Sequence, residues 1–194
     1  VFDPLVHEPV PPAPGPAPSS IDRMAVGDTR WVRCRRPVVI CGGELRLEML
    51  DLDFDEGTRF YQAPPQVKAN NGIFIVDDLG RQLMQTHELM NRWIVPLDRH
   101  RDYLSLHTGH KFAIPFDEIV VFSTNLKPLD LVDEAFLRRI GYKIHLGPLT
   151  EDEYRTVFRD VCAQFGVEFR EDMLQLLLHD YHAREQRHNY FIGE

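Results

Sequence analysis

Two short apolar runs, each ending in polar residues, form the clearest pattern along the chain. The run 73–76 (IFIV) ends in Asp77 and Asp78, and the run 119–122 (IVVF) ends in the polar residues 123–125 (STN). Continuous apolar runs of this length, closed by polar side chains, are typical of strands buried on both faces of a parallel sheet. The pattern therefore predicts two parallel strands that deliver their polar ends to one edge of a sheet.

Apolar residues at helical spacing follow both strands. They predict one helix over residues 81–93 and another over 128–139, and a third short strand is expected over 142–146. Strands that alternate with helices in this way predict an α/β fold built on a parallel sheet.

After Pro148 the pattern is helical only. The first of two helices starts with a capping box, in which Thr150 is followed three residues later by Glu153, and it ends near residues 165–166. The second is expected from about residue 170 to residue 182. The sequence therefore predicts a small helical appendage behind the sheet.

Prolines and a change of phase mark the first part of the chain. Seven of the 14 prolines lie in residues 1–20, which predicts an extended linker or a long surface excursion. Residues 31–36 are expected to form an exposed strand or turn leading to a buried segment at 37–41. Between residues 45 and 54 apolar residues occupy alternate positions, but the alternation shifts by one residue between 49 and 50. That slip fits either two short strands with a bulge or a strand after a helical turn.

The composition excludes several classes of protein. The 22 Lys+Arg and 30 Asp+Glu give a formal charge of −8, and 43% of the residues are hydrophobic, which is an ordinary globular balance. No apolar run approaches the roughly 20 residues that span a bilayer, so we expect no membrane span. The negative charge argues against a protein that coats nucleic acid. Three scattered cysteines and an amino terminus without a leader pattern favour a cytoplasmic location.

Polar side chains at the carboxyl edge of the sheet are the first candidates for chemistry, because open α/β sheets bind ligands there. An apolar strand that ends in adjacent carboxylates is a Walker B pattern. In that pattern Asp77 reaches Mg²⁺, usually through water, and Asp78 polarises an attacking water. Buried strands that end in two aspartates also occur without any such role.

Two further features follow along the chain. Asn125 ends the second strand beside Thr124, where a side-chain amide could hold the same water against a γ-phosphate. The helix that comes next ends in Arg138 and Arg139. Guanidinium groups are suited to stabilising charge on a transferring phosphoryl group, including one bound by a neighbouring subunit.

This order of motifs resembles the AAA+ ATPases of the P-loop NTPase superfamily. Walker B at Asp77 and Asp78 is followed by sensor 1 at 124–125, and an arginine finger then stands at Arg138 or Arg139. The stretch 69–78 (ANNGIFIVDD) also looks like the approach to Walker B in the MoxR-like and related branches.

The resemblance implies a partial P-loop NTPase core over residues 21–147 and a partial helical lid over 148–194, after the Pro-rich segment 1–20. It implies ATP and Mg²⁺ as cofactors of the full-length protein, which would act as an ATPase in a homo-oligomeric ring and remodel a protein or other macromolecular substrate. Catalysis would then involve Asp78, Asn125 and one of the two arginines, and cofactor binding would involve Asp77 and Thr124.

Two departures limit what the resemblance implies. Asp78 stands where the family normally has Glu, one methylene longer. The pattern G-x-x-x-x-G-K-[ST] does not occur in the 194 residues, so we expect that loop upstream of Val1 and expect this chain alone to bind ATP feebly or not at all. Arg184 and Arg187 are unplaced candidates for sensor 2.

Other functions stay open at this stage. A degenerate P-loop fold could serve as a non-catalytic interaction module, and a local basic cluster could contact nucleic acid. Residues 51–55 start like an EF-hand loop but lack its later ligands, and two histidine pairs lack a third metal ligand. The basic cluster comprises Arg30, Arg33, Arg35 and Arg36, and the histidine pairs are His107 with His110 and His179 with His182.

Overall fold

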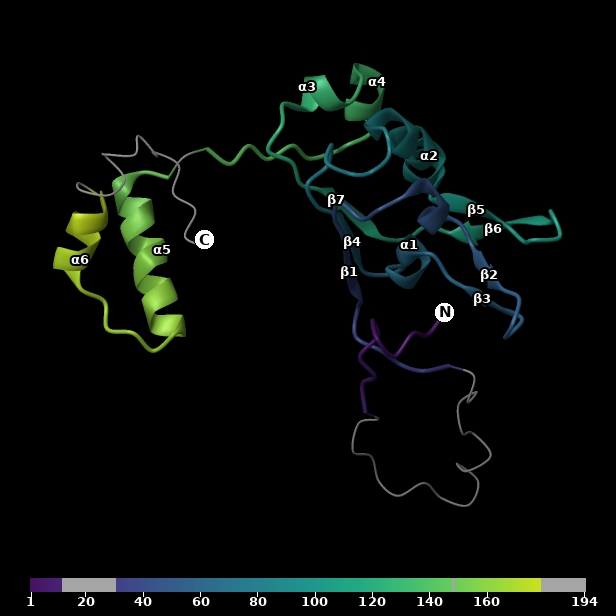
Figure 1. Ribbon diagram of the computed structural model, residues 1–194, viewed down its shortest axis with the longest axis horizontal. Coiled ribbons are helices and arrows are strands. Elements are labelled where there is room, and N and C mark those ends of the chain that lie inside the picture. The colour runs from purple at the N-terminus through teal and green to yellow at the C-terminus, as the bar shows by residue number, and fades with distance from the viewer. Residues whose placement is uncertain (12–30, 148, 179–194) are drawn as a thin grey trace, which may run out of the picture. The chain divides into compact units, whose positions relative to one another are not determined.

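The computed structural model describes residues 1–11, 31–147 and 149–178 (Figure 1). The chain divides into two compact units, Val1–Gly141 and Tyr142–Glu194. Within the described residues, no helix combines the length and the apolar character needed to cross a membrane.

A three-stranded parallel sheet forms the centre of the first unit. It consists of β1 (Val38–Cys41), β4 (Ile73–Val76) and β7 (Ile119–Phe122), in the order β1-β4-β7. All four residues of β4 pair in register with both neighbours, so β4 is the central strand. The two parallel strands expected from the apolar runs are confirmed.

Aromatic side chains cover one face of this sheet. Phe74 of β4 stacks on Trp93 of helix α2 (Thr86–Arg99), with ring centroids 5.2 Å apart and planes 7° apart. Phe116 and Phe122 meet the Trp93 ring edge-on. Aromatic pairs of this kind add about 0.5–1.5 kcal/mol each beyond the area they bury. This cluster therefore anchors α2 to the sheet.

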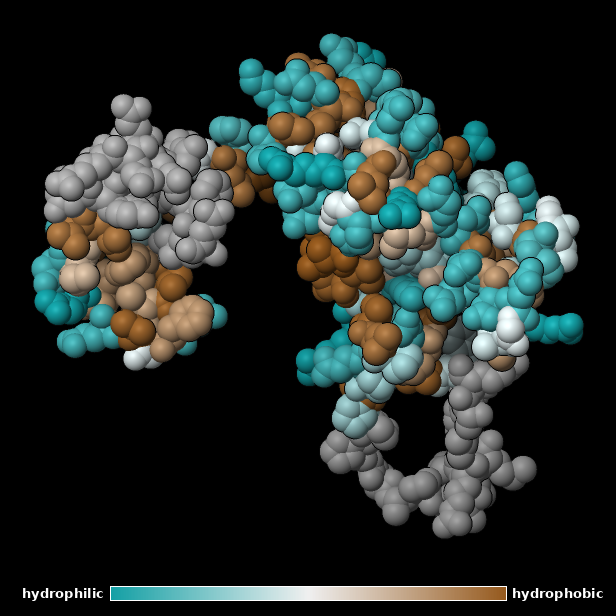
Figure 2. All heavy atoms as spheres, in the orientation of Figure 1, coloured by the Kyte–Doolittle hydropathy of each residue, from teal (hydrophilic) through white to brown (hydrophobic). Residues whose placement is uncertain are grey.

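The opposite face of the sheet is apolar and open to solvent. Val38 and Ile40 of β1 are 54% and 62% exposed, and Ile119 and Val121 of β7 are 64% and 40% exposed. Figure 2 shows hydrophobic residues gathered over these strands. The expectations that residues 37–41 and the run 119–122 are buried are therefore wrong for every second residue, because only one face of the sheet is covered.

Two antiparallel hairpins belong to the same unit (Figure 1). The first pairs β2 (Asp53–Asp55) with β3 (Phe60–Gln62), and the second pairs β5 (Arg101–Ser105) with β6 (Lys111–Pro115). His107, in the turn of the second hairpin, links the two. Its ring stacks on Phe54 with centroids 3.9 Å apart, and its Nδ1 is hydrogen-bonded to the Tyr61 hydroxyl.

The segments around the first hairpin show what residues 45–54 and residues 31–36 form. A 3-10 helix, η2 (Leu47–Leu50), precedes β2, so the slip in phase marks a helical turn followed by a strand. Helix α1 (Pro65–Lys68) follows β3 and starts with proline, which suits a first helical turn. Residues 31–36 form no regular strand, and Cys34 makes a single antiparallel bridge with Pro9.

Both helices predicted for the first unit differ from expectation. The helix expected over 81–93 is α2, which starts at Thr86 because a turn occupies the residues before it, and it continues past Pro96 to Arg99. The helix expected over 128–139 is two short helices, α3 (Pro128–Leu131) and α4 (Glu134–Leu137). The break arises because Val132 is extended and the Asp133 side chain accepts a hydrogen bond from the Phe136 amide, which starts a new helix.

The second unit contains α5 (Glu151–Gln164) and α6 (Glu171–Leu176). The predicted capping box is confirmed: the Glu153 amide donates to Thr150 Oγ1 and the Thr150 amide donates to Glu153 Oε2. The predicted strand over 142–146 is wrong. Its side chains at 142, 144 and 146 are 84–90% exposed, and within the described residues no strand pairs with it. The expected second helix beyond residue 178 lies outside the described residues.

Candidate functional site

The carboxyl ends of β4 and β7 meet, as the sequence predicts. Ser123 Oγ, directly after β7, donates a hydrogen bond to Asp77 Oδ1, directly after β4. The backbone supports this contact, because the Ser123 amide donates to the Val76 carbonyl over 3.0 Å and the Asp77 amide donates to the Cys41 carbonyl over 2.8 Å. All three strands thus end at one edge of the sheet, with Asp77 above the central strand.

Asp77 and Asp78 lie in a tight turn with a left-handed backbone. Asp78 has a φ of 51° and Gly80 a φ of 99°. Short polar residues and glycine tolerate that region better than other residues do. The φ of Gly80 therefore favours glycine, and a Cβ there would also lie 2.5 Å from Leu131 Cδ2, so that side chain would have to move. The turn therefore reverses the chain directly behind the two carboxylates.

Gln82 ties this turn together, and sequence reasoning missed it. Its Nε2 donates to the Asp77 carbonyl over 2.9 Å and to the Asp78 carbonyl over 3.2 Å. Its Oε1 accepts from the Gly80 amide over 2.8 Å. No periodicity or motif marks Gln82, because its role depends on a fold-back of the chain over a few residues.

Thr124 supports the same turn from β7. Its Oγ1 donates to the Leu79 carbonyl over 2.8 Å and accepts from the Leu126 amide over 3.1 Å. The Leu79 amide donates to the Ser123 carbonyl over 2.8 Å. The Thr124 hydroxyl is thus engaged within the protein, whereas the neighbouring Asn125 is exposed at the same edge.

The two candidate arginines have different surroundings. Arg139 Nε donates to both carboxylate oxygens of Asp98 in α2, at 2.8 and 2.9 Å, and its Nη1 donates to the Ala135 carbonyl over 2.6 Å. The Arg138 side chain is 80% exposed, and it contacts Glu134 at 3.5 Å, one helical turn away. Arg139 therefore connects α4 to α2, and Arg138 presents its guanidinium to solvent.

The two carboxylates fit the chemistry of Mg²⁺, which prefers oxygen ligands and retains several waters. Asp77 Oδ1 accepts from Ser123 Oγ and from the Asp78 amide, so Oδ2 is the oxygen turned to other partners. Across the part of the chain that the structure describes, no three His, Cys, Asp or Glu side chains gather as a metal site. A cation here would complete its shell with water and with oxygens of a bound phosphate.

Cys41 ends β1 at the same edge. Burial, together with the charge of Glu44, raises the pKa of the Cys41 thiol to about 11. The nucleophilic form of cysteine is the thiolate, so Cys41 is a packed thiol at neutral pH rather than a nucleophile.

The remaining sequence candidates engage in local contacts or lie outside the described residues. Asp51 accepts from the Ser105 amide, Arg35 pairs with Glu8 at 3.2 Å, and Arg36 donates to the Asn71 carbonyl over 3.3 Å. The candidates outside the described residues are Arg30, His179, His182, Arg184 and Arg187.

Comparisons with known proteins concern both the sequence and the fold. Residues 150–191, within the second unit, match a sequence family described as "Domain of unknown function (DUF8689)". No curated protein matches the sequence. Solved structures with a similar fold are compared next.

The structure is similar to NtrX from Brucella abortus, with a TM-score of 0.51 and 14% sequence identity over 73% of this chain. A second NtrX structure, in complex with ADP, gives a TM-score of 0.51 and 15% identity over 75% of this chain. The chain spans 34% and 35% of these two NtrX chains. At such low identity the likeness concerns the fold alone. It supports a mixed α/β fold with a parallel sheet.

Proposed function

We propose that this chain carries the carboxylate part of an AAA+ ATP-hydrolysing site. The observation that carries the proposal is the contact between Asp77 and Ser123, which brings the ends of β4 and β7 together. In the proposal, β4 is the Walker B strand and β7 is the sensor 1 strand. The likeness to the NtrX fold, and the ADP present in one NtrX structure, support the same function.

Each candidate residue has a defined role in this proposal. Mg²⁺, when bound, would neutralise charge on the phosphate oxygens, and Asp77 would hold it, through water or directly by Oδ2. Asp78 would orient a water molecule and accept its proton while the water oxygen bonds to the γ-phosphorus. The bond to the bridging oxygen breaks, and ADP leaves with that electron pair. Asn125 would hold the same water or the γ-phosphate.

Arg138 is our choice for the finger that acts on a neighbouring subunit. Its guanidinium is exposed, whereas Arg139 is engaged with Asp98 and with the backbone. Removing an arginine of this kind lowers phosphoryl transfer by about 10³–10⁵-fold in P-loop enzymes. An arginine that acts on a neighbouring subunit requires a ring of identical subunits, which is therefore part of the proposal. Such a ring would couple ATP hydrolysis to remodelling of a macromolecule in the cytoplasm.

The proposal requires a phosphate-binding loop in addition to these 194 residues. No G-x-x-x-x-G-K-[ST] occurs in them, so the chain alone has neither the backbone amides nor the lysine that hold the β- and γ-phosphates. We therefore expect ATP hydrolysis from the natural protein that contains this chain, and little ATP affinity from the chain by itself.

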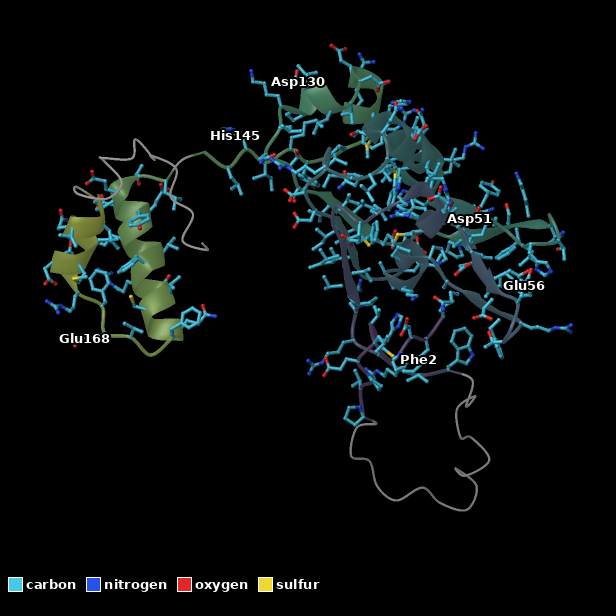
Figure 3. All side chains as sticks on the ribbon, viewed as in Figure 1. Phe2, Asp51, Glu56, Asp130, His145 and Glu168 are labelled. Carbon is cyan, nitrogen blue, oxygen red and sulfur yellow. The ribbon has the colours of Figure 1, made fainter. Side chains whose placement is uncertain are left out.

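Hydrolysis at different Mg²⁺ concentrations tests the role of Asp77. In the natural protein, Asp77→Asn should raise the Mg²⁺ concentration needed for half-maximal hydrolysis by tenfold or more, because the amide is a weaker cation ligand than the carboxylate. Asp130→Asn is the matched control, since Asp130 is an exposed aspartate on α3 (Figure 3). An unchanged Mg²⁺ dependence in Asp77→Asn would remove Asp77 from the site and favour a non-catalytic interaction module.

A further inference from the structure

Gln82 makes three hydrogen bonds to the turn that carries the two candidate carboxylates. Its amide nitrogen donates to the carbonyls of Asp77 and Asp78, and its amide oxygen accepts from the Gly80 amide. Only a side chain with both a donor and an acceptor at this position can make all three contacts. The side chain therefore acts as a clasp that closes the turn on itself.

The turn needs such a clasp because its backbone is strained. Asp78 is a non-glycine residue with a φ of 51°, a conformation that aspartate tolerates better than most residues but that still costs free energy unless surrounding contacts stabilise it. Contacts from β7 hold the middle of the turn, at the amide and carbonyl of Leu79. Gln82 holds the carbonyls on the other side, directly at Asp77 and Asp78.

We propose that Gln82 is a positioning residue that holds the Asp77 and Asp78 carboxylates in the geometry for binding a divalent cation. The inference rests on the proposed function of this site. Gln82 itself does not touch the cation. It fixes the peptide groups that carry both carboxylates, and Ser123 already holds Oδ1 of Asp77.

A titration of the 194-residue chain with Mn²⁺ tests the inference, with paramagnetic broadening of the Asp77 and Asp78 amide signals as the measurement. Gln82→Met keeps the length of the side chain and removes all three hydrogen bonds. It should raise the Mn²⁺ concentration for half-maximal broadening by about fivefold or more. The matched control is Gln85→Met, because Gln85 is exposed and makes no side-chain capping bond to α2.

Hydrogen exchange of the Gly80 amide provides an independent readout of the clasp. Exchange of this amide should be faster in Gln82→Met than in the wild-type chain, while the buried β4 amides keep their protection and show that the fold persists. Faster exchange with an unchanged Mn²⁺ titration would overturn the positioning role. An absence of Mn²⁺ broadening in the wild-type chain would also overturn this inference. The proposed function is tested separately by the Mg²⁺ dependence of hydrolysis in Asp77→Asn, so the two failures are distinguishable.

Discussion

Ser123 donates a hydrogen bond to the Asp77 carboxylate, although the two residues are 46 positions apart in the sequence. The contact joins the ends of β7 and β4 and engages one carboxylate oxygen of Asp77. It leaves the other oxygen of Asp77 as the one available for a cation or water. One side chain from the second strand thus determines how the first strand presents its acid.

Ser123→Ala should lower the free energy of unfolding by about 0.5–1.5 kcal/mol, because the Asp77 carboxylate loses a partner at the sheet edge. The measurement is urea unfolding followed by the fluorescence of Trp93, which is buried in the same unit. Ser105→Ala is the control, since Ser105 uses its backbone amide, not its hydroxyl, to reach Asp51. Equal losses for the two variants would show that the Ser123 contact does not stabilise the fold.

Replacement of Arg139 should lower the free energy of unfolding more than replacement of Arg138 does. Arg139→Ala removes a contact between α4 and α2 through Asp98, and should cost about 0.5–1.5 kcal/mol of unfolding free energy. Arg138→Ala should change it by less than about 0.5 kcal/mol, because exposed pairs one helical turn apart contribute little. Urea unfolding of both variants checks this difference. A larger loss for Arg138→Ala than for Arg139→Ala would reverse the assignment.

A buried ion pair holds α2 to β5. Arg92 contacts both carboxylate oxygens of Asp102, at 2.5 and 2.8 Å, and Asp102 is 1% exposed. Arg92→Ala should lower the free energy of unfolding by about 3–5 kcal/mol, because it leaves a buried charge without its cation.

The double variant Arg92→Met with Asp102→Leu distinguishes the loss of the ion pair from the cost of leaving the Asp102 carboxylate buried without a cation. It should cost less than Arg92→Ala alone, since both charges leave together. Thermal unfolding of the single and double variants is the measurement. A double variant that is less stable than the single one would contradict this account.

Glu118 should make stability depend on pH. Both of its carboxylate oxygens are buried and have no hydrogen-bond partner within the described residues. Burial raises the pKa of Glu118 from 4.5 to about 8, with a further contribution from the charge of Asp102. Between these two pH values the folded chain holds a proton that the unfolded chain has lost, so stability should fall as pH rises from 4.5 to 8.

Glu118→Gln should remove this dependence, with a gain over wild type of about 3–5 kcal/mol above pH 8 and almost none below pH 4.5. Urea unfolding across this pH range gives the comparison. The control is Glu56→Gln, an exposed acid between β2 and β3 (Figure 3). If the difference in the free energy of unfolding between wild type and Glu118→Gln did not change with pH, Glu118 would not be a buried neutral acid.

The open face of the sheet should drive self-association of the chain. Exposed contiguous apolar patches on soluble proteins mark contact surfaces or aggregation sites. Replacing Ile40 and Ile119 with threonine keeps strand propensity and lowers the apolar area, so it should reduce self-association in sedimentation velocity. Leu5→Thr is the control, because Leu5 is 93% exposed and belongs to none of these strands. Equal association of all variants would remove the sheet face as its cause.

Local signals in the sequence predicted the parts of the fold that depend on local chemistry. The apolar runs before Asp77 and Ser123 identify β4 and β7, because a buried strand requires such a run wherever it lies. The capping box of Thr150 and Glu153 likewise involves only neighbouring residues. These predictions needed no knowledge of which elements pack together.

The errors concern features that depend on distant partners. Residues 142–146 have the apolar alternation of a strand, but a strand forms only where another strand is available to pair with it. Val38 and Ile40 carry the apolar pattern of buried residues, yet their face of the sheet is open. Gln82 escaped notice because a glutamine in a loop has no pattern, and only the folded turn brings the carbonyls of Asp77 and Asp78 to it.

The most direct test of the central claim is ATP turnover by the natural protein with Asp78 replaced. Asp78→Asn keeps the shape of the side chain and removes the base, so we predict a fall in turnover of about a hundredfold or more. Asp78→Glu keeps the carboxylate and should retain most of the turnover. Equal turnover in Asp78→Asn and the wild type would contradict the assignment of this edge of the sheet as the hydrolytic site.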